Sequence, residues 1–122
     1  MALFTLTTNE YINQPPSQIG NGSAITNYGQ VYTFTEADFT TNTVPVYIDP
    51  EGDNAFELKI TSLPSDGTLE YNSVAVIVNQ IISFSDIGSG LFKYIPDNGN
   101  TSQYNTTFNF EVSDSGSQIF IS

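Results

Sequence analysis

The 122 residues suffice for one domain; two are basic and thirteen acidic, giving a formal net charge of -11, and histidine, arginine, cysteine and tryptophan are absent. This composition excludes imidazole bases, thiol nucleophiles, disulfides and the usual zinc and haem ligands. Metals that bind through oxygen, such as calcium, are the cofactors that the composition still allows. Two lysines cannot match a phosphate backbone or an anionic membrane surface, so we expect neither nucleic acid nor a membrane as a partner.

The N-terminal residues 1–13 are predicted to form an extended arm. They begin with a short alternation of apolar residues, turn polar, and lead to Pro15-Pro16, which enforces an extended connection. The start has no basic region and no continuous apolar region, so it does not resemble a secretory signal. We therefore expect a protein that begins at Met1, stays in the compartment where it is made, and consists of the arm and a domain over residues 14–122.

The first half of the domain alternates between short strands and turns. A polar, glycine-rich stretch over residues 17–29 predicts a loose first strand, and Gln30–Thr35 alternates as a regular strand does. The acidic segment Glu36–Phe39 predicts a tight turn that returns its phenylalanine to the core. Residues Val44–Ile48 are extended, but Pro45 lacks an amide hydrogen and belongs at a sheet edge.

A second group of strands follows the turn at residues 49–53. The segment Ala55–Ser62 alternates, which places Phe56, Leu58 and Ile60 on the face toward the core. Later strands are predicted over Thr68–Tyr71, Val74–Val78, Ile81–Phe84, Leu91–Ile95, Thr106–Val112 and Gln118–Ile121.

Two local signals connect these later strands. Asn72-Ser73 is a two-residue hairpin turn, and Ser85–Gly88 predicts one helical turn capped by Ser85. Isoleucine, valine and threonine number 12, 7 and 14, whereas alanine and leucine together number 11, a balance that favours pleated sheets over helices. The fold class is therefore all-β, an antiparallel sandwich of about seven to nine short strands.

Several segments, in this order, resemble the cadherin-like or immunoglobulin-like tandem repeats of bacterial surface proteins. They cover roughly residues 14–122 and are Tyr32–Phe39, Asp49–Asp53, Lys59–Leu69, Ile81–Ile87, Leu91–Pro96 and Phe108–Asp114. The resemblance implies a sandwich of the immunoglobulin or cadherin type, with Asn13-Gln14-Pro15-Pro16 at the junction with a preceding module. Members of this family occur mostly as many copies in exported chains, whereas we expect a single free-standing copy here. Such modules also look like those on phage virions and related contractile particles.

One cluster of acids is a candidate calcium site. Asp49, Glu51 and Asp53 alternate across one glycine-containing turn, which can aim three oxygens at one point. The resemblance implies that the acids after the second strand and at the end of the Phe-x-Phe strand, Glu36, Asp38 and Asp114, gather at the same end. The spacing is not that of an EF-hand, and the alternative is a surface turn whose Asp and Gly satisfy backbone geometry. Since cadherin-type sites are shared between domains, a neighbouring protein could complete this one.

Catalysis is not expected. Thirteen acids produce carboxylate pairs at glycosidase spacing by chance, and a serine nucleophile would have no base except a lysine, around which no serine motif occurs. A glycan is the other ligand class that stays open, because tyrosines near turns could stack on sugars. These are Tyr11, Tyr28, Tyr71 and Tyr104, and the alternative is that they cap the ends of the sandwich.

The leading hypothesis is a non-enzymatic structural protein of a phage or phage-like particle, a capsid decoration, head-fibre or tail-associated component. It would assemble in the bacterial cytoplasm, in many copies or as a homo-oligomer, and contact other particle proteins through the arm and an open edge strand. The main alternative is an adhesive or carbohydrate-binding module of the bacterial cell surface, with calcium as a stabilising ion. A third is a fragment of a multidomain exported protein.

Overall fold

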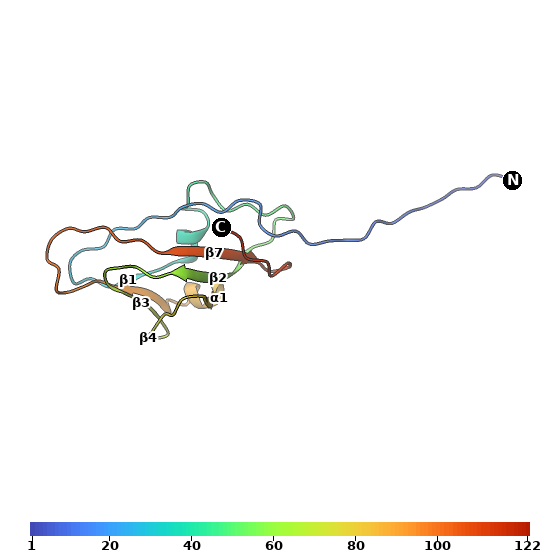
Figure 1. Ribbon diagram of the computed structural model, residues 1–122. Coiled ribbons are helices and arrows are strands. Elements are labelled where there is room, and N and C mark those ends of the chain that lie inside the picture. Colours follow the sequence, from blue (N-terminus) through green and yellow to red (C-terminus); the bar gives the residue numbers. More distant parts are fainter.

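The computed structural model describes residues 1–122 and is an all-β protein with two antiparallel sheets. Its seven short strands confirm the predicted sandwich (Figure 1). One sheet has the order β1-β6-β3-β4, formed by Tyr32–Thr33, Phe92–Ile95, Thr68–Tyr71 and Val74–Ala75. The other has the order β5-β2-β7, formed by Gln80–Ser83, Ala55–Ser62 and Asn109–Asp114. Two short helices, the 3-10 helix η1 (Glu36–Phe39) and the α-helix α1 (Phe84–Gly88), complete the domain, and no helix has the length and apolar character needed to cross a membrane.

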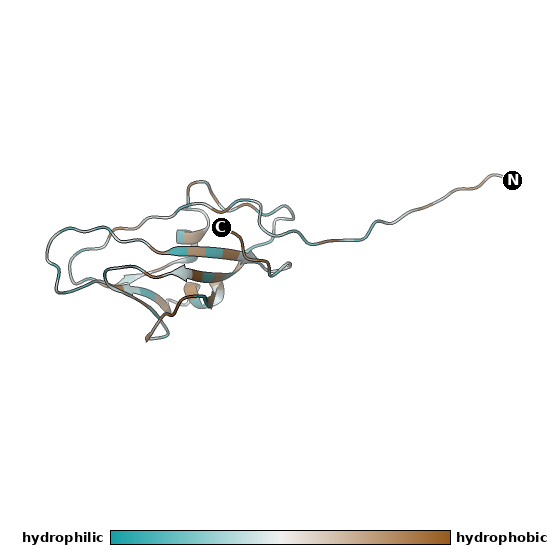
Figure 2. Cartoon of the chain, viewed as in Figure 1, coloured by the Kyte–Doolittle hydropathy of each residue, from teal (hydrophilic) through white to brown (hydrophobic).

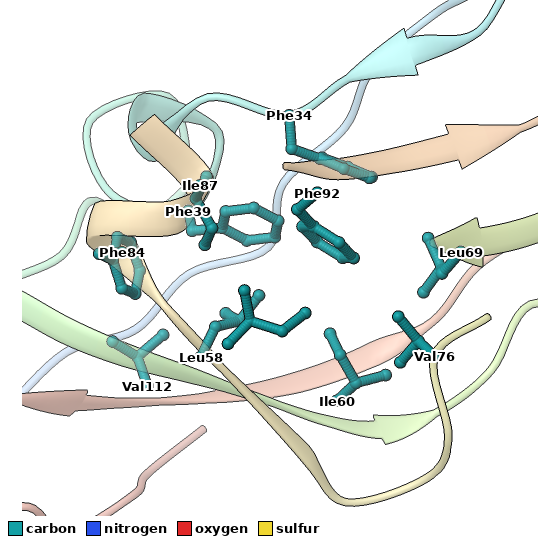
Figure 3. Packing of buried hydrophobic residues seen from close by; sticks show 11 residues of the cluster. Phe34, Phe39, Leu58, Ile60, Leu69, Val76, Phe84, Ile87, Phe92 and Val112 are labelled. Atoms are coloured by element: carbon teal, nitrogen blue, oxygen red, sulfur yellow. The ribbon is translucent and has the colours of Figure 1, made fainter. Parts of the chain in front are cut away.

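The core lies between the sheets and is rich in aromatic rings. Phe34 and Phe92 stack with their ring centroids 4.4 Å apart, and Phe39 from η1 packs against both (Figure 3). The opposite sheet contributes fully buried aliphatic side chains, among them Leu58 and Ile60. Alternating hydrophobic and hydrophilic colours along β2 and β7 in Figure 2 reflect the one-sided burial that the sequence predicts for antiparallel strands.

The prediction for Phe56 was wrong. Leu58 and Ile60 are fully buried, but Phe56 is 42 % exposed. The pairing of β2 with β7 shifts register between Ala55 and Glu57, which is the position of a β-bulge. Because a bulge adds one residue to the strand, it breaks the period of two and turns Phe56 away from the core.

The hairpin turn is formed as predicted, but the helical turn begins earlier than expected. Asn72 and Ser73 both have positive φ, 52° and 66°, between the paired strands β3 and β4. Helix α1 starts at Phe84, and its N-cap is Ser83 rather than Ser85, since the Ser83 hydroxyl accepts a hydrogen bond from Asp86 N at 3.1 Å. The strand before it ends one residue sooner, which places Phe84 in the helix.

Three predicted strands are reduced to single bridges. The segments around residues 17–29 and 44–48 meet only at Gln18–Ile48 and Asn21–Val44, and the C-terminal segment pairs only through Ile121 with Val112. In the second of these segments, Pro45 has no amide hydrogen to donate to a ladder. The two regular sheets therefore have little lateral cover from the first and last parts of the domain.

Helix η1 is held by a side chain that caps its own start. Asp38 Oδ2 accepts hydrogen bonds from Thr35 N and from the Tyr32 hydroxyl, both at 2.9 Å. Burial and this hydrogen bond raise the pKa of Tyr32 to about 12. The helix in turn presents Phe39, which is 3 % exposed, to the core.

Replacing this capping carboxylate is expected to destabilise the protein. We predict that Asp38→Ala lowers the free energy of unfolding by about 1–2 kcal/mol, because two donors lose their acceptor. Urea denaturation measures the change, and Glu36→Gln, at an exposed neighbouring acid, is the control with an expected change within about 0.5 kcal/mol. Equal stability of the two variants would contradict the capping role.

Candidate metal site

The turn between Ile48 and β2 is organised by the first of its acids. Asp49 Oδ1 accepts hydrogen bonds from Glu51 N at 2.9 Å and from Asp53 N at 3.1 Å. Gly52 has a φ of 75°, a conformation that glycine adopts without strain. The turn thus curls around the Asp49 side chain and brings the three carboxylates to one side.

Asp114, the last residue of β7, approaches this turn from the other strand. It pairs in register with Ala55 at the start of β2, so it lies beside the end of the turn. Its side chain is fully buried, and its Oδ1 accepts hydrogen bonds from Gly116 N, Ser117 N and Ser117 Oγ at 3.2, 2.6 and 2.7 Å. Asp114 is therefore a buried carboxylate with one oxygen fully used and the other free.

The four acids Asp49, Glu51, Asp53 and Asp114 converge, each offering one oxygen within 4.8 Å of all the others. The Oδ2 atoms of Asp49 and Asp114 are both buried without a hydrogen-bond partner. Burial and the nearby Asp114 raise the pKa of Asp49. Burial opposes ionisation of Asp114 too, but the hydrogen bonds from Ser117 and Gly116 outweigh it and lower the pKa of this carboxyl. When both carboxyls are ionised, two buried carboxylate oxygens that face each other without a cation are costly.

Tyr47 lies beside the acidic cluster, and its hydroxyl is affected by the same negative charges. The Tyr47 hydroxyl donates to the Asp53 carbonyl at 3.1 Å. Burial, followed by the charges of Asp49, Asp114 and Asp53, raises the pKa of Tyr47. A cation at this point would compensate a local excess of negative charge that no lysine reaches, since the only salt bridge joins Lys59 and Glu111.

The residues present fit calcium. Oxygens that bind one Ca²⁺ at roughly 2.3–2.6 Å lie at most about 5 Å apart, and the four carboxylate oxygens meet this condition. Calcium takes six to eight oxygens, and the four carboxylates supply part of this number. The orphaned Oδ2 atoms of Asp49 and Asp114 are the observation that distinguishes this cluster from an ordinary acidic turn.

The base of the N-terminal arm closes the cluster, a contribution that the metal prediction had omitted. Asn13 Nδ2 donates to Asp53 Oδ2 at 2.7 Å, and Gln14 N donates to Glu51 Oε1 at 2.6 Å. Asn13 Oδ1 is buried without a partner, so it is one more oxygen that a cation could use. The signal in the sequence was the Asn-x-Pro-Pro start, which marks the point where the arm enters the domain.

The other two acids of the predicted set are outside the cluster. Glu36 and Asp38 lie on η1, where Asp38 accepts the capping hydrogen bonds and Glu36 is exposed. The structure therefore brings together four of the six predicted acids.

All four candidate sugar-stacking tyrosines use their hydroxyls within the chain. Tyr28 donates to the Asn98 carbonyl, Tyr71 donates to Asp86, and Tyr104 shares a hydrogen bond with Tyr94 at 2.8 Å. The fourth, Tyr11, lies in the exposed arm, where its hydroxyl accepts a hydrogen bond from Asn13 Nδ2 at 3.2 Å. These roles correspond to the alternative interpretation, in which the tyrosines tie loops to the ends of the sandwich.

No family model, curated protein or solved structure matches this chain. The fold and the site define its class as a small all-β sandwich with an acidic cluster at the base of an extended N-terminal arm.

Proposed function

We propose that the protein is a non-enzymatic structural component of a phage or phage-like particle, either a capsid decoration, a head-fibre or a tail-associated protein. It attaches to neighbouring particle proteins through its N-terminal arm and is present in many copies. It assembles in the bacterial cytoplasm and ends in the virion.

The observation that carries this proposal is the arm. Residues 1–12 are all exposed, and no residue before Ser17 makes a backbone-to-backbone hydrogen bond. Leu3, Phe4 and Leu6 are 84–88 % exposed, although each is a side chain that gains from burial. An apolar segment that the domain leaves uncovered is typical of an attachment element.

We propose further that the acidic cluster holds a structural calcium ion. The ion would be held by Asp49, Glu51, Asp53 and Asp114, and it would neutralise the two facing carboxylates. Because Asn13 and Gln14 bind the same acids, the ion would also fix the direction in which the arm leaves the domain.

Co-sedimentation tests the attachment role. The tagged full chain is expressed in the cells that encode it, and particles are separated on a density gradient. We expect the wild-type chain in the particle fraction and the variant lacking residues 1–12 at the top of the gradient, with equal melting temperatures for both. A wild-type chain that never enters a particle fraction would overturn the proposal.

A specific observation favours one second candidate, an adhesive or carbohydrate-binding module of the bacterial cell surface. Aromatic and amide side chains, among them Tyr28, Tyr104, Asn27 and Asn105, line one open groove. Sugars are commonly bound by aromatic faces together with amide hydrogen-bonding groups. Glycan binding by the purified monomer, without incorporation into particles, would support this second candidate in place of the first.

A further inference from the structure

We infer that the arm of one copy fills an open groove on a second copy as an added strand, so that copies of the chain associate with one another. This inference rests on the proposed function, in which the arm is the attachment element, and it names the partner of the arm. The inference is supported by the shape and lining of the groove, by the composition of the arm and by the direction in which the arm leaves the domain.

The groove lies between two long segments, residues 19–28 and residues 96–110. Its lining includes the core rings Phe34 and Phe39, together with half-buried Phe108 and Phe110. Part of the surface of the half-buried Phe108 and Phe110 is thus accessible from outside at this place, while Phe34 and Phe39 stay buried beneath it. A β-sandwich normally covers such surface with a strand.

Most of both groove walls has no strand partner, although the second wall ends in the first residues of β7, which pair with β2. No backbone-to-backbone hydrogen bond involves residues 22–26 or residues 101–108. Over residues 104–110 the burial nevertheless alternates strictly between half-buried and exposed, which is the pattern of an extended strand. This wall continues β7 backward with free amide and carbonyl groups, so it can accept a further strand.

The arm has the chemistry of the missing strand. In an extended conformation Phe4 and Leu6 lie on one face, and Leu3 lies on the opposite face. Residues 1–9 contain no acid, although the chain as a whole carries thirteen. Because Asp38, Asp97 and Glu111 line the groove, an occupant without acids avoids the like-charge repulsion that most other segments of this chain would suffer.

The arm is also long enough to pair with the groove wall at residues 104–110. Nine extended residues span about 30 Å, whereas the alternating wall of seven residues spans about 23 Å. The arm can therefore pair along the whole of this wall.

The direction of the arm favours a second copy over the arm's own domain. The arm leaves at Asn13, whose side chain is bonded to Asp53, near the end of β7. The wall at residues 101–108 precedes the start of β7, at the other end of that strand. Figure 1 shows the arm pointing away from the loops that form the groove. The contact joins an arm to a groove, so it builds a closed pair when two copies exchange arms reciprocally, and rings or filaments when each arm passes to a further copy.

Mutations on the two faces of the arm test the inference. We compare wild type, Leu6→Asp and the matched control Leu3→Asp, because both leucines are more than 80 % exposed and neither supports the fold. We expect concentration-dependent oligomers of wild type in analytical ultracentrifugation, a self-association at least about tenfold weaker for Leu6→Asp, and a near wild-type value for Leu3→Asp. Melting curves of the three proteins should coincide at a concentration at which all three are monomeric.

Hydrogen exchange locates the contact in the same samples. Amides of residues 101–108 should become protected as the wild-type concentration rises, and they should stay unprotected in Leu6→Asp. A wild-type protein that is monomeric at all concentrations, equal effects of the two substitutions, or protection confined to residues outside the arm and the groove would each overturn the inference. A monomer whose groove is already protected would mean that the arm fills its own domain, and this also overturns it.

The two proposals can fail separately. If the arm is required for co-sedimentation with a particle but the purified chain is monomeric, the proposed function stands and the self-association is lost. If the chain self-associates through the groove but never enters a particle, the inference stands and the particle role is lost.

Discussion

Calcium is expected to raise the melting temperature of the wild-type protein, by about 10 °C when its concentration exceeds the dissociation constant a hundredfold. The physical reason is the pair of orphaned oxygens, Asp49 Oδ2 and Asp114 Oδ2, which are buried without partners and face a site rich in negative charge. A cation that binds only the folded state stabilises it by mass action. Thermal denaturation in millimolar calcium and in excess chelator measures the difference.

Asp114→Asn should remove this calcium response. An asparagine carbonyl can still accept the hydrogen bonds from Ser117 and Gly116, while the charge that faces Asp49 disappears. In chelator the variant should therefore be at least as stable as wild type, and in calcium it should be less stable. This reversal separates a metal ligand from a residue that only supports the fold.

The matched control for this experiment is Asp97→Asn, at an exposed acid outside the cluster. It should keep the full calcium response. Identical melting temperatures of the wild-type protein in calcium and in chelator would rule out the calcium site, and the cluster would then be an acidic turn.

The second large effect is expected in the core, where Phe92→Ala should lower the free energy of unfolding by about 3–5 kcal/mol. Phe92 is fully buried on β6. Its ring centroid lies 4.4 Å from that of Phe34, 6.1 Å from that of Phe39 and 6.3 Å from that of Phe108. Truncation leaves a cavity that rigid neighbouring rings cannot close. Urea denaturation at 25 °C measures the loss.

The same substitution in the arm provides the control. Phe4→Ala removes an identical ring from a side chain that is 84 % exposed, so the unfolding free energy of the monomer should stay within about 0.5 kcal/mol. A loss at Phe92 no larger than that at Phe4 would contradict the aromatic core described here.

Local patterns predicted the regular part of the fold. The alternation in residues 55–62 and 106–112 predicted β2 and the greater part of β7, which pair with each other, and the pair Asn72-Ser73 predicted the hairpin turn. Both signals are short-range: side chains alternate by geometry, and a two-residue turn depends on the φ angles of its own residues. The bulge that exposes Phe56 has no such signal, because it arises from the register between β2 and β7.

One part of the acidic cluster could likewise be predicted from local sequence, and the other part depends on contacts between distant residues. The turn at residues 49–53 could be recognised in the sequence because its three acids lie within five residues of one another. Asp114 joins it only through the pairing of β7 with β2, and Asn13 only through the path of the arm. Glu36 and Asp38 have the same chemistry, but Asp38 is used to cap η1.

The sequence by itself determined the fold class, the positions of the best strands and the absence of imidazole and thiol chemistry, since these follow from composition and from side-chain periodicity. Only the tertiary structure decided which acids meet, which aromatic rings are covered and where the sandwich stays open. Those outcomes depend on contacts between residues far apart in the chain, such as Asp49 with Asp114 and Phe34 with Phe92, whose geometry is set by strand register and packing.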